Sequence, residues 1–255
     1  MNVSGNTILI TGGTSGIGLE FAKSFLGLGN TVIVTGRDKS RLDAILAAHP
    51  GLRGIVSDAA DPAAITRLHE QVVGEFPAMN VLVNNAGIMR IVGLADPRSL
   101  EDVTQEIDID LAGPIRMVQQ FLPDLRTKPN ATIVNVSSGL AFVPIPISPI
   151  YSAAKAALHA YTRCLRDQLK NSGVSVVEVA PPLTETPLFS DEFKSMMKGA
   201  KGMPVDVLVR KAIAGLKAGK TEIRPGQSNA LKIFSRIAPG FIFAQMGKVG
   251  PPATA

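Results

Sequence analysis

The chain has 255 residues, of which 45% are hydrophobic and 18% are charged, and its formal net charge is +5. This length and composition predict a soluble globular protein with a substantial core, and they exclude an intrinsically disordered chain. Apolar runs stay well short of the roughly 20 residues that a membrane-spanning helix needs, and the basic residues are scattered without interleaved aromatics, which argues against a nucleic-acid partner.

Short apolar segments alternate with helical segments along the whole chain. Apolar, β-branched runs predict buried strands, and apolar residues spaced three or four apart predict helices. The expected strands are residues 7–11, 31–35, 54–57, 81–83, 132–136, 174–179 and 221–224. The expected helices are residues 15–28, a segment around 41–46, a segment from 61 onward, and residues 99–121, 151–170 and 206–218. This order predicts an α/β fold, with a Rossmann-type doubly wound parallel sheet of about seven strands and helices on both faces. We expect a single domain over residues 1–255, with an apolar C-terminal extension at 226–255.

Four candidate motifs directly follow predicted strands. They are a glycine turn at residues 11–18, Asn84-Asn85-Ala86-Gly87, Ser137-Ser138 and Pro181-Pro182. The carboxyl ends of the strands meet along one edge of a parallel sheet, and ligands bind beyond that edge. We therefore expect the four motifs to line one site.

The glycine turn has the composition of a dinucleotide-binding turn. Gly12, Gly16 and Gly18 follow a strand and open a helix. The backbone can therefore approach a pyrophosphate, whose charge a helix N-terminus favours. The spacing is G-x-x-x-G-x-G rather than the common G-x-G-x-x-G. The other cofactor-binding residues predicted in this turn are Thr14, Ser15 and Ile17.

The end of the second strand indicates which dinucleotide binds. An NAD site usually offers a carboxylate here to the ribose hydroxyls, but the best-placed residue is Gly36. The guanidinium of Arg37 suits a 2′-phosphate, whereas Asp38 is better placed to cap the next helix. We therefore predict NADP(H) rather than NAD. Asp58 and Ala59 are also predicted to bind the cofactor. Asp58 could accept a hydrogen bond from the adenine, or it could cap its own loop.

Tyr151 and Lys155 form a candidate acid–base pair. Their spacing of four places both side chains on one face of a predicted helix. A phenol has an ordinary pKa of about 10, and a neighbouring ammonium favours the phenolate and so lowers that pKa. Ser138, thirteen residues upstream, could hydrogen-bond the atom that Tyr151 protonates.

In the order and spacing of these motifs the chain resembles the short-chain dehydrogenase/reductase family. The resemblance implies that Tyr151 is the general acid/base, that Lys155 lowers its pKa and binds the nicotinamide ribose, and that Ser138 holds the substrate oxygen. The implied activity is that of an NADP(H)-dependent oxidoreductase, which interconverts a ketone or aldehyde and an alcohol by hydride transfer. The implied cofactor-binding residues are Asn85, Ala86, Gly87, Val136, Tyr151, Lys155, Pro181, Leu183, Thr184 and Thr186. Residues 137–144, 180–182 and 235–239 are similar to the DltE-type branch of the family.

Two positions depart from the family pattern. Asp110 stands where the family has an Asn that anchors a water of the proton relay, and Pro182 stands where Gly is common. An ionised Asp accepts hydrogen bonds but does not donate them, and a carboxylate near Lys155 would stabilise its ammonium. We include Asp110 among the catalytic residues and leave three interpretations open. They are a working substitute, a slow enzyme and an NADP(H)-binding redox sensor.

The walls of the substrate pocket are predicted to be apolar. They comprise residues 88–92, 140–150 and 188–197, the last of which is a candidate lid. Such walls favour an uncharged, partly hydrophobic substrate. Arg90 is interpreted as an exposed loop residue, with recognition of an anion as the alternative.

Assembly and location are also predicted. The long helices suit the helix-pair interfaces typical of the family, so we expect a homodimer or homotetramer. Cys164 is the only cysteine, which excludes an internal disulfide, and we expect it to be packed. The absence of signal-peptide features favours a cytoplasmic location. Residues 231–243 are apolar and basic, and we expect them to pack against the body or a neighbouring subunit. A membrane surface is the less favoured alternative.

Overall fold

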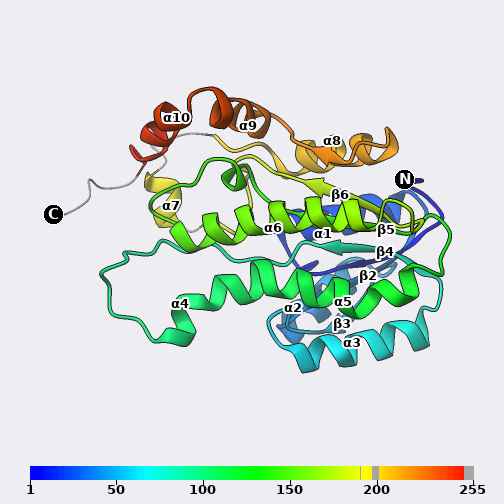
Figure 1. Cartoon of the computed structure of the whole chain (residues 1–255). Coiled ribbons are helices and arrows are strands. Elements are labelled where there is room, and N and C mark those ends of the chain that lie inside the picture. The colour runs from blue at the N-terminus through cyan, green and yellow to red at the C-terminus, as the bar shows by residue number, and fades with distance from the viewer. Residues whose placement is uncertain (190, 197–200, 250–255) are drawn as a thin grey trace.

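The computed structural model of the chain describes residues 1–189, 191–196 and 201–249 (Figure 1). Within these residues, one all-parallel sheet has the strand order β3-β2-β1-β4-β5-β6-β7. The strands are β1 (Thr7–Ile10), β2 (Thr31–Gly36), β3 (Arg53–Val56), β4 (Met79–Asn84), β5 (Thr132–Val136), β6 (Ser175–Val179) and β7 (Glu222–Ile223). The predicted doubly wound Rossmann-type fold is therefore confirmed.

Helices cover both faces of this sheet. One face is covered by α1 (Gly16–Gly27), α2 (Lys39–Ala48) and α8 (Val205–Lys217). The other face is covered by α3 (Pro62–Glu75), α5 (Gly113–Leu125) and α6 (Pro149–Gln168). The remaining elements are α4 (Leu100–Ile107), the π-helical turn η1 (Asp108–Ala112), the 3₁₀ turn η2 (Gly139–Ala141), α7 (Asp191–Met196), α9 (Gln227–Ile237) and α10 (Pro239–Met246).

The strands are mostly apolar because both faces of the sheet are buried. Successive side chains of a strand point to opposite faces. Ile8 and Ile10 accordingly belong to the core under α1 and α8, while Leu9 belongs to the core under α3, α5 and α6. A strand that faces two cores cannot alternate with polar residues, which explains why the apolar runs located these strands correctly.

The strand order creates the crevice for a ligand. From β1 the chain builds outward through β2 to β3, and then crosses back to place β4 on the other side of β1. The connections that leave β1 and β4 therefore diverge to opposite faces. This is the topological switch point at which open α/β sheets bind ligands.

The helix expected at residues 99–121 is interrupted. Its first part is α4 and its last part is α5, and η1 lies between them as a π-helical turn. A π turn inserts an extra residue into the helix and is frequent at functional sites. Asp110 lies in this turn and is completely buried.

The C-terminal part of the described chain differs most from expectation. Residues 231–243 lie in two helices, α9 and α10, which carry exposed apolar side chains. The candidate lid at 188–197 contains α7, but residues 190 and 197 lie outside the described residues, as do residues 250–255 of the extension. Among the described helices, none is long and apolar enough to cross a bilayer.

Cys164 is exposed on α6, so the prediction that it is packed was wrong. The buried face of α6 includes Leu158, Thr162 and Leu165, and Cys164 lies off this face.

Candidate active site

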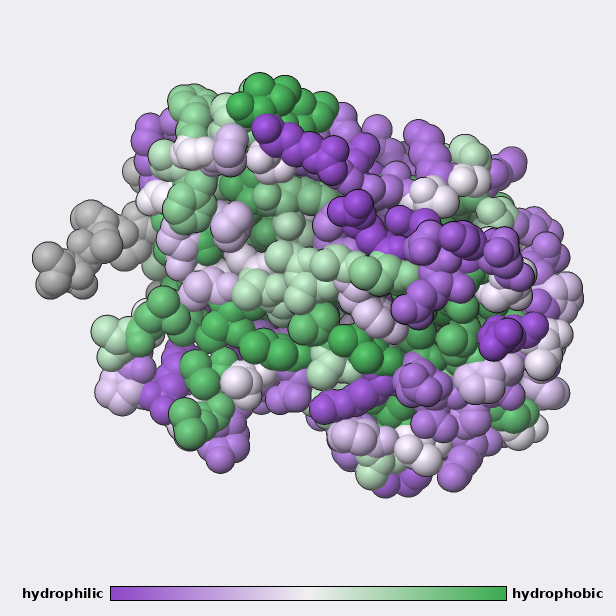
Figure 2. All heavy atoms as spheres, viewed as in Figure 1, coloured by the Kyte–Doolittle hydropathy of each residue, from purple (hydrophilic) through white to green (hydrophobic). Residues whose placement is uncertain are grey.

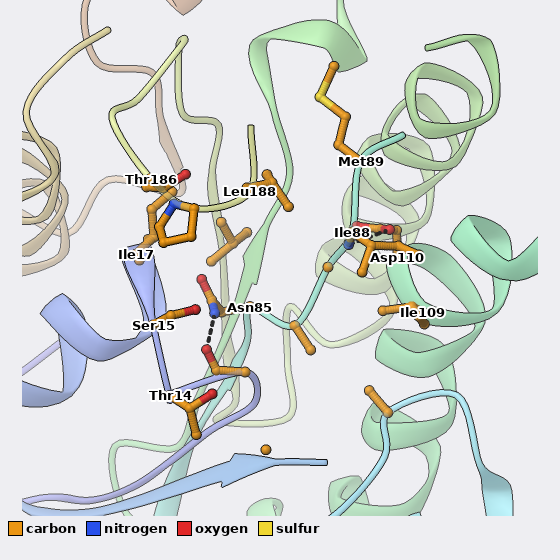
Figure 3. A pocket seen from close by; sticks show the side chains of 18 of the residues that line it. Thr14, Ser15, Ile17, Asn85, Ile88, Met89, Ile109, Asp110, Thr186 and Leu188 are labelled. Carbon is orange, nitrogen blue, oxygen red and sulfur yellow. Dashed lines mark hydrogen bonds between the residues drawn. The ribbon is translucent and has the colours of Figure 1, made fainter. Parts of the chain in front are cut away.

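A cavity of about 640 Å³ lies along the carboxyl edge of the sheet, and all four motifs contribute to it. Figure 3 shows Thr14, Ser15 and Ile17 on one side of the cavity and Met89, Ile109 and Asp110 on the other. The cavity brings together most of the residues predicted for the site: Gly12, Thr14, Ser15, Gly16, Ile17, Arg37, Asp58, Ala59, Asn85, Ala86, Gly87, Asp110, Val136, Ser138, Tyr151, Lys155, Pro181, Thr184 and Thr186. Two predicted residues, Gly18 and Leu183, do not line it.

The glycine turn is held in place by the segment that follows β4. Thr11 Oγ1 accepts hydrogen bonds from the backbone N–H groups of Asn85 and Ala86, both at 3.0 Å. The Asn85 amide donates in return to the backbone oxygens of Thr11 and Gly12, at 3.0 and 3.1 Å. A Cβ at Gly18 would overlap the Asn85 amide and the Gly12 oxygen. Gly18 therefore permits this close packing rather than ligand contact.

Gly12 is required for two separate reasons. Its φ of +65° lies in the left-handed region that favours glycine. A Cβ there would also lie 2.8 Å from the Cα of Ala86. The turn can therefore pass close to the segment after β4 while its backbone stays open to the cavity.

The end of β2 leaves no room for an acidic side chain at residue 36. A Cβ on Gly36 would lie 2.6 Å from the Thr14 methyl group. Arg37 and Arg41 both line the cavity at this end. Asp38 caps α2 by accepting a hydrogen bond from the Arg41 backbone N–H at 3.0 Å, as predicted. Arg41 was not predicted from the sequence, although a second arginine in the first turn of α2, four residues after Arg37, was a usable signal.

One of the two roles predicted for Asp58, the capping of its own loop, is confirmed. Its carboxylate accepts a hydrogen bond from the Ala60 backbone N–H at 2.9 Å, which caps the loop after β3. The residue also lines the cavity. Capping therefore does not remove Asp58 from the reach of a ligand.

Tyr151, Lys155 and Asp110 form a buried cluster at the other end of the cavity. The Lys155 Nζ lies 5.5 Å from the centre of the Tyr151 ring and 2.9 Å from Asp110 Oδ1. It also donates a hydrogen bond to the Val136 backbone oxygen at 3.2 Å. The second oxygen of Asp110 accepts from the Ile88 backbone N–H at 3.1 Å. Lys155 is therefore held between the end of β5 and the π-helical turn.

Gly87 is the position that lets Asp110 reach Lys155. A Cβ on Gly87 would overlap Asp110 Oδ1 and would lie 3.5 Å from the Lys155 Nζ. Ser138 is also buried, and its Oγ accepts a hydrogen bond from the Leu140 backbone N–H at 3.1 Å. This bond fixes the hydroxyl at the start of η2.

Burial and charge act in opposite directions on these groups. Burial raises the pKa of Tyr151, the Asp110 carboxylate raises it further, and the opposing effects of Lys155 and Ser138 do not outweigh them. The net direction differs from the lowered pKa expected from the sequence, because desolvation disfavours the phenolate. Burial alone would lower the pKa of Lys155, but Asp110 and Tyr151 hold that pKa above its ordinary value. Burial also raises the pKa of Asp110, and Lys155 opposes this effect.

Arg90 is neither an exposed loop residue nor a free anion receptor. Its guanidinium contacts Asp102 Oδ1 at 2.7 Å and Glu106 Oε2 at 3.5 Å. Its backbone N–H donates to Glu106 at 2.9 Å, and its backbone oxygen accepts from the Ser148 hydroxyl at 2.6 Å. Glu106 is completely buried, and burial raises the pKa of its carboxyl. Arg90 therefore anchors the loop after β4 to α4.

Comparison with known proteins identifies the family to which the chain is similar. The family profile of the short chain dehydrogenases matches residues 6–197. The uncharacterized oxidoreductase DltE of Bacillus subtilis (strain 168) is 38% identical over 249 residues, which cover 96% of this chain and 98% of DltE.

Solved structures share the fold over almost the entire chain. A short chain dehydrogenase from Burkholderia cenocepacia in complex with NADP has a TM-score of 0.83 at 23% identity, covering 98% of this chain and all of that one. A short chain dehydrogenase/reductase from Burkholderia phymatum in complex with NAD has a TM-score of 0.82 at 21% identity, covering both chains completely.

Proposed function

The chain belongs to the short-chain dehydrogenase/reductase family, and from this premise we propose that it is an NADP(H)-dependent oxidoreductase that interconverts a ketone or aldehyde and an alcohol. The observation that carries the proposal is the meeting of Ser138, Tyr151 and Lys155 at one end of the cavity whose other end carries the glycine turn. Family membership makes the chain an oxidoreductase that uses NAD or NADP. The choice of NADP, the carbonyl chemistry and the residue roles are our proposals.

The residues at the glycine turn suit a dinucleotide. Gly12 and Gly16 both have positive φ and border the cavity, so backbone rather than side chain faces the position of the pyrophosphate. Arg37 and Arg41 would contact a 2′-phosphate, while Gly36 offers no carboxylate to ribose hydroxyls. Relatives of the same fold are known with NADP and with NAD, so this end of the cavity carries our preference for NADP(H).

The chemistry follows from the buried cluster. When bound, the nicotinamide supplies or accepts the hydride. Tyr151 donates a proton to the carbonyl oxygen during reduction and takes it back during oxidation, and the Ser138 hydroxyl holds that oxygen. Lys155 stabilises the phenolate left after proton donation, and Asp110 keeps Lys155 protonated. General acid catalysis of this kind contributes roughly 10²–10⁴-fold.

The substrate is proposed to be uncharged and partly hydrophobic. The apolar side chains that line the cavity include Ile88, Met89, Ile109, Leu188 and Phe189. Arg90 also lines the cavity, but its guanidinium is already paired with the carboxylates of Asp102 and Glu106. An anionic substrate would therefore gain little from it. A hydrophobic aldehyde or ketone fits this lining better.

A second function remains open because of Asp110. Its pairing with Lys155 at 2.9 Å takes up part of the positive charge that would otherwise favour the Tyr151 phenolate. A site of this kind could bind NADP(H) and turn over slowly or not at all. A redox sensor is thus the alternative to an efficient enzyme.

The test combines turnover with cofactor binding. NADPH and NADH oxidation would be followed with a panel of aliphatic and aromatic aldehydes and ketones, using wild type, Tyr151→Phe and the matched control Tyr161→Phe. Tyr161 lies on the same helix but does not line the cavity. We expect Tyr151→Phe to lose about 10²-fold or more of the turnover with little change in NADPH affinity, and Tyr161→Phe to remain active.

Other outcomes would be equally informative. Turnover that persists in Tyr151→Phe would refute the proposed acid/base. Tight NADPH binding without reduction of any carbonyl, in wild type and in Asp110→Asn, would favour the sensor.

A further inference from the structure

Helix α9 presents two polar residues, Ser228 and Lys232, to the body of the protein and leaves three large apolar residues, Ile233, Phe234 and Ile237, exposed. Ser228 is completely buried against the turn η2, where a Cβ on Gly139 would lie 2.9 Å from the Ser228 hydroxyl. Lys232 also points inward, where its ammonium pairs with the Glu222 carboxylate and lies 5.2 Å from the centre of the Phe142 ring. Surface helices usually turn their large apolar side chains toward the core. In α9, Leu231 does so beside Gly139, but Ile233, Phe234 and Ile237 do not.

The outward side continues from α9 into α10. Ile233, Phe234 and Ile237 recur at positions i, i+1 and i+4 of α9, and Phe241 and Phe243 follow in α10. These five side chains, which we call the α9–α10 face, are all exposed; Ile237 exposes 73% of its surface and Phe241 64%. Figure 2 shows hydrophobic side chains at the upper edge of the molecule, where α9 lies in Figure 1. A group of adjoining exposed apolar residues of this size marks a surface that interacts with a protein, a membrane or a ligand.

The charged residues of the segment that carries the α9–α10 face are all basic. Residues 227–249 contain Lys232, Arg236 and Lys248 and no acidic residue. Lys232 is paired with the Glu222 carboxylate, whereas Arg236 and Lys248 are exposed. The nearest acid preceding the segment, Glu222, is already paired with Arg224 and Lys232. The face therefore combines exposed aromatic and branched side chains with uncompensated positive charge.

These properties select among possible occupants. In a symmetric dimer the same patch would meet its own copy, and residues 227–249 of that copy would bring no carboxylate to pair with Arg236 and Lys248. Neither helix is long enough to cross a bilayer, because α9 has 11 residues and α10 has 8. A short helix with one apolar face and basic residues at its border suits the interface plane of an anionic membrane.

We propose that the α9–α10 face binds the surface of an anionic lipid bilayer, with Ile237 and Phe241 inserted between the headgroups and Arg236 and Lys248 contacting lipid phosphates. The proposal is independent of the reaction at the active site. It changes the expectation from the sequence, because the structure leaves this segment's apolar side chains uncovered.

Sedimentation with vesicles tests this proposal directly. The full-length protein would be centrifuged with vesicles of phosphatidylglycerol and phosphatidylcholine in equal parts and with pure phosphatidylcholine vesicles. We expect the wild type to sediment with the anionic vesicles, and to do so less at high salt. The affinity of the double variant Ile237→Ser/Phe241→Ser for the anionic vesicles should be lower by roughly ten-fold or more. The reason is that burial of one such side chain changes an equilibrium constant by about a factor of ten.

Two further variants separate the apolar and the charged contributions. Leu94→Ser/Leu100→Ser is the matched control, because these side chains are 78% and 82% exposed but lie outside the face; it should bind like the wild type. Arg236→Gln/Lys248→Gln should weaken binding to the anionic vesicles several-fold and leave binding to neutral vesicles unchanged.

The proposal is overturned if the wild type stays in the supernatant, or if both serine variants lose binding equally. It is also overturned if size-exclusion chromatography with light scattering shows an oligomer that Ile237→Ser/Phe241→Ser dissociates, since a second copy would then cover the face.

Discussion

Replacement of Asp110 by Asn should destabilise the protein and let Tyr151 lose its proton at a lower pH. The substitution preserves the size of the side chain but removes its charge and one of its two acceptor oxygens. In the native structure both oxygens are used, one by the Lys155 ammonium and the other by the Ile88 backbone N–H. The Asn amide nitrogen would have to face one of these two donors.

The expected loss of stability follows from this geometry. At 2.9 Å, the attraction between the two charges is roughly 6 kcal/mol with an effective dielectric constant of about 20, and much of it offsets the desolvation of both groups. An orphaned buried donor costs about 1–3 kcal/mol. The cost rises toward roughly 3–5 kcal/mol if Lys155 remains charged without its partner. Urea unfolding at neutral pH measures the difference.

The proton affinity of Tyr151 can be measured without a substrate. The chain has two tyrosines and no tryptophan, so a Tyr161→Phe background leaves Tyr151 as the only phenol. This background also removes Tyr161, whose pKa burial raises to about 12. Tyrosinate absorbance against pH then reports Tyr151 alone. Since the Asp110 carboxylate raises the pKa of Tyr151, Asp110→Asn should move the titration to lower pH.

A control in the same turn separates this effect from general damage. Asp108 also lies in η1, but its side chain is about half exposed. It pairs with Arg116 at 3.8 Å rather than with Lys155. Asp108→Asn should leave both the titration and the stability nearly unchanged. If Asp110→Asn left the Tyr151 titration in place or moved it to higher pH, the coupling inferred between these groups would be refuted.

Three other substitutions test separate parts of the structure. Arg90→Met should destabilise the protein by about 3–5 kcal/mol in urea unfolding, because it leaves the buried Glu106 carboxylate without a cation; adding Glu106→Gln should restore part of the loss, and no restoration would contradict the pairing. Gly18→Ala should lower Tm and weaken NADPH binding, at a cost of about 1–3 kcal/mol from overpacking, whereas Gly27→Ala in the same helix has free space and should change neither. Arg37→Leu should lower kcat/KM for NADPH by about 10–100-fold, the value of a charged hydrogen bond, and leave NADH unaffected; an equal loss with both cofactors would contradict the proposed role.

Much of the fold could be predicted because its signals are local. Strand 132–136 was located to the residue, since a strand buried on both faces must be an apolar run. The turn at Gly12 was recognisable because a left-handed backbone next to a helix start favours glycine. Tyr151 and Lys155 lie one helical turn apart, so their proximity followed from helix geometry alone.

The sequence by itself thus determined the layer order of the fold, the edge of the sheet where the site lies and the pairing of Tyr151 with Lys155. Only the tertiary structure decided that Asp110 contacts Lys155, that Arg90 pairs with two carboxylates, and that large apolar side chains of α9 stay exposed. Local patterns report the conformation of a segment and the periodicity of its side chains. Which charge meets which, and which face of a helix is covered, depends on residues far apart in the chain, and only the packed structure brings them together.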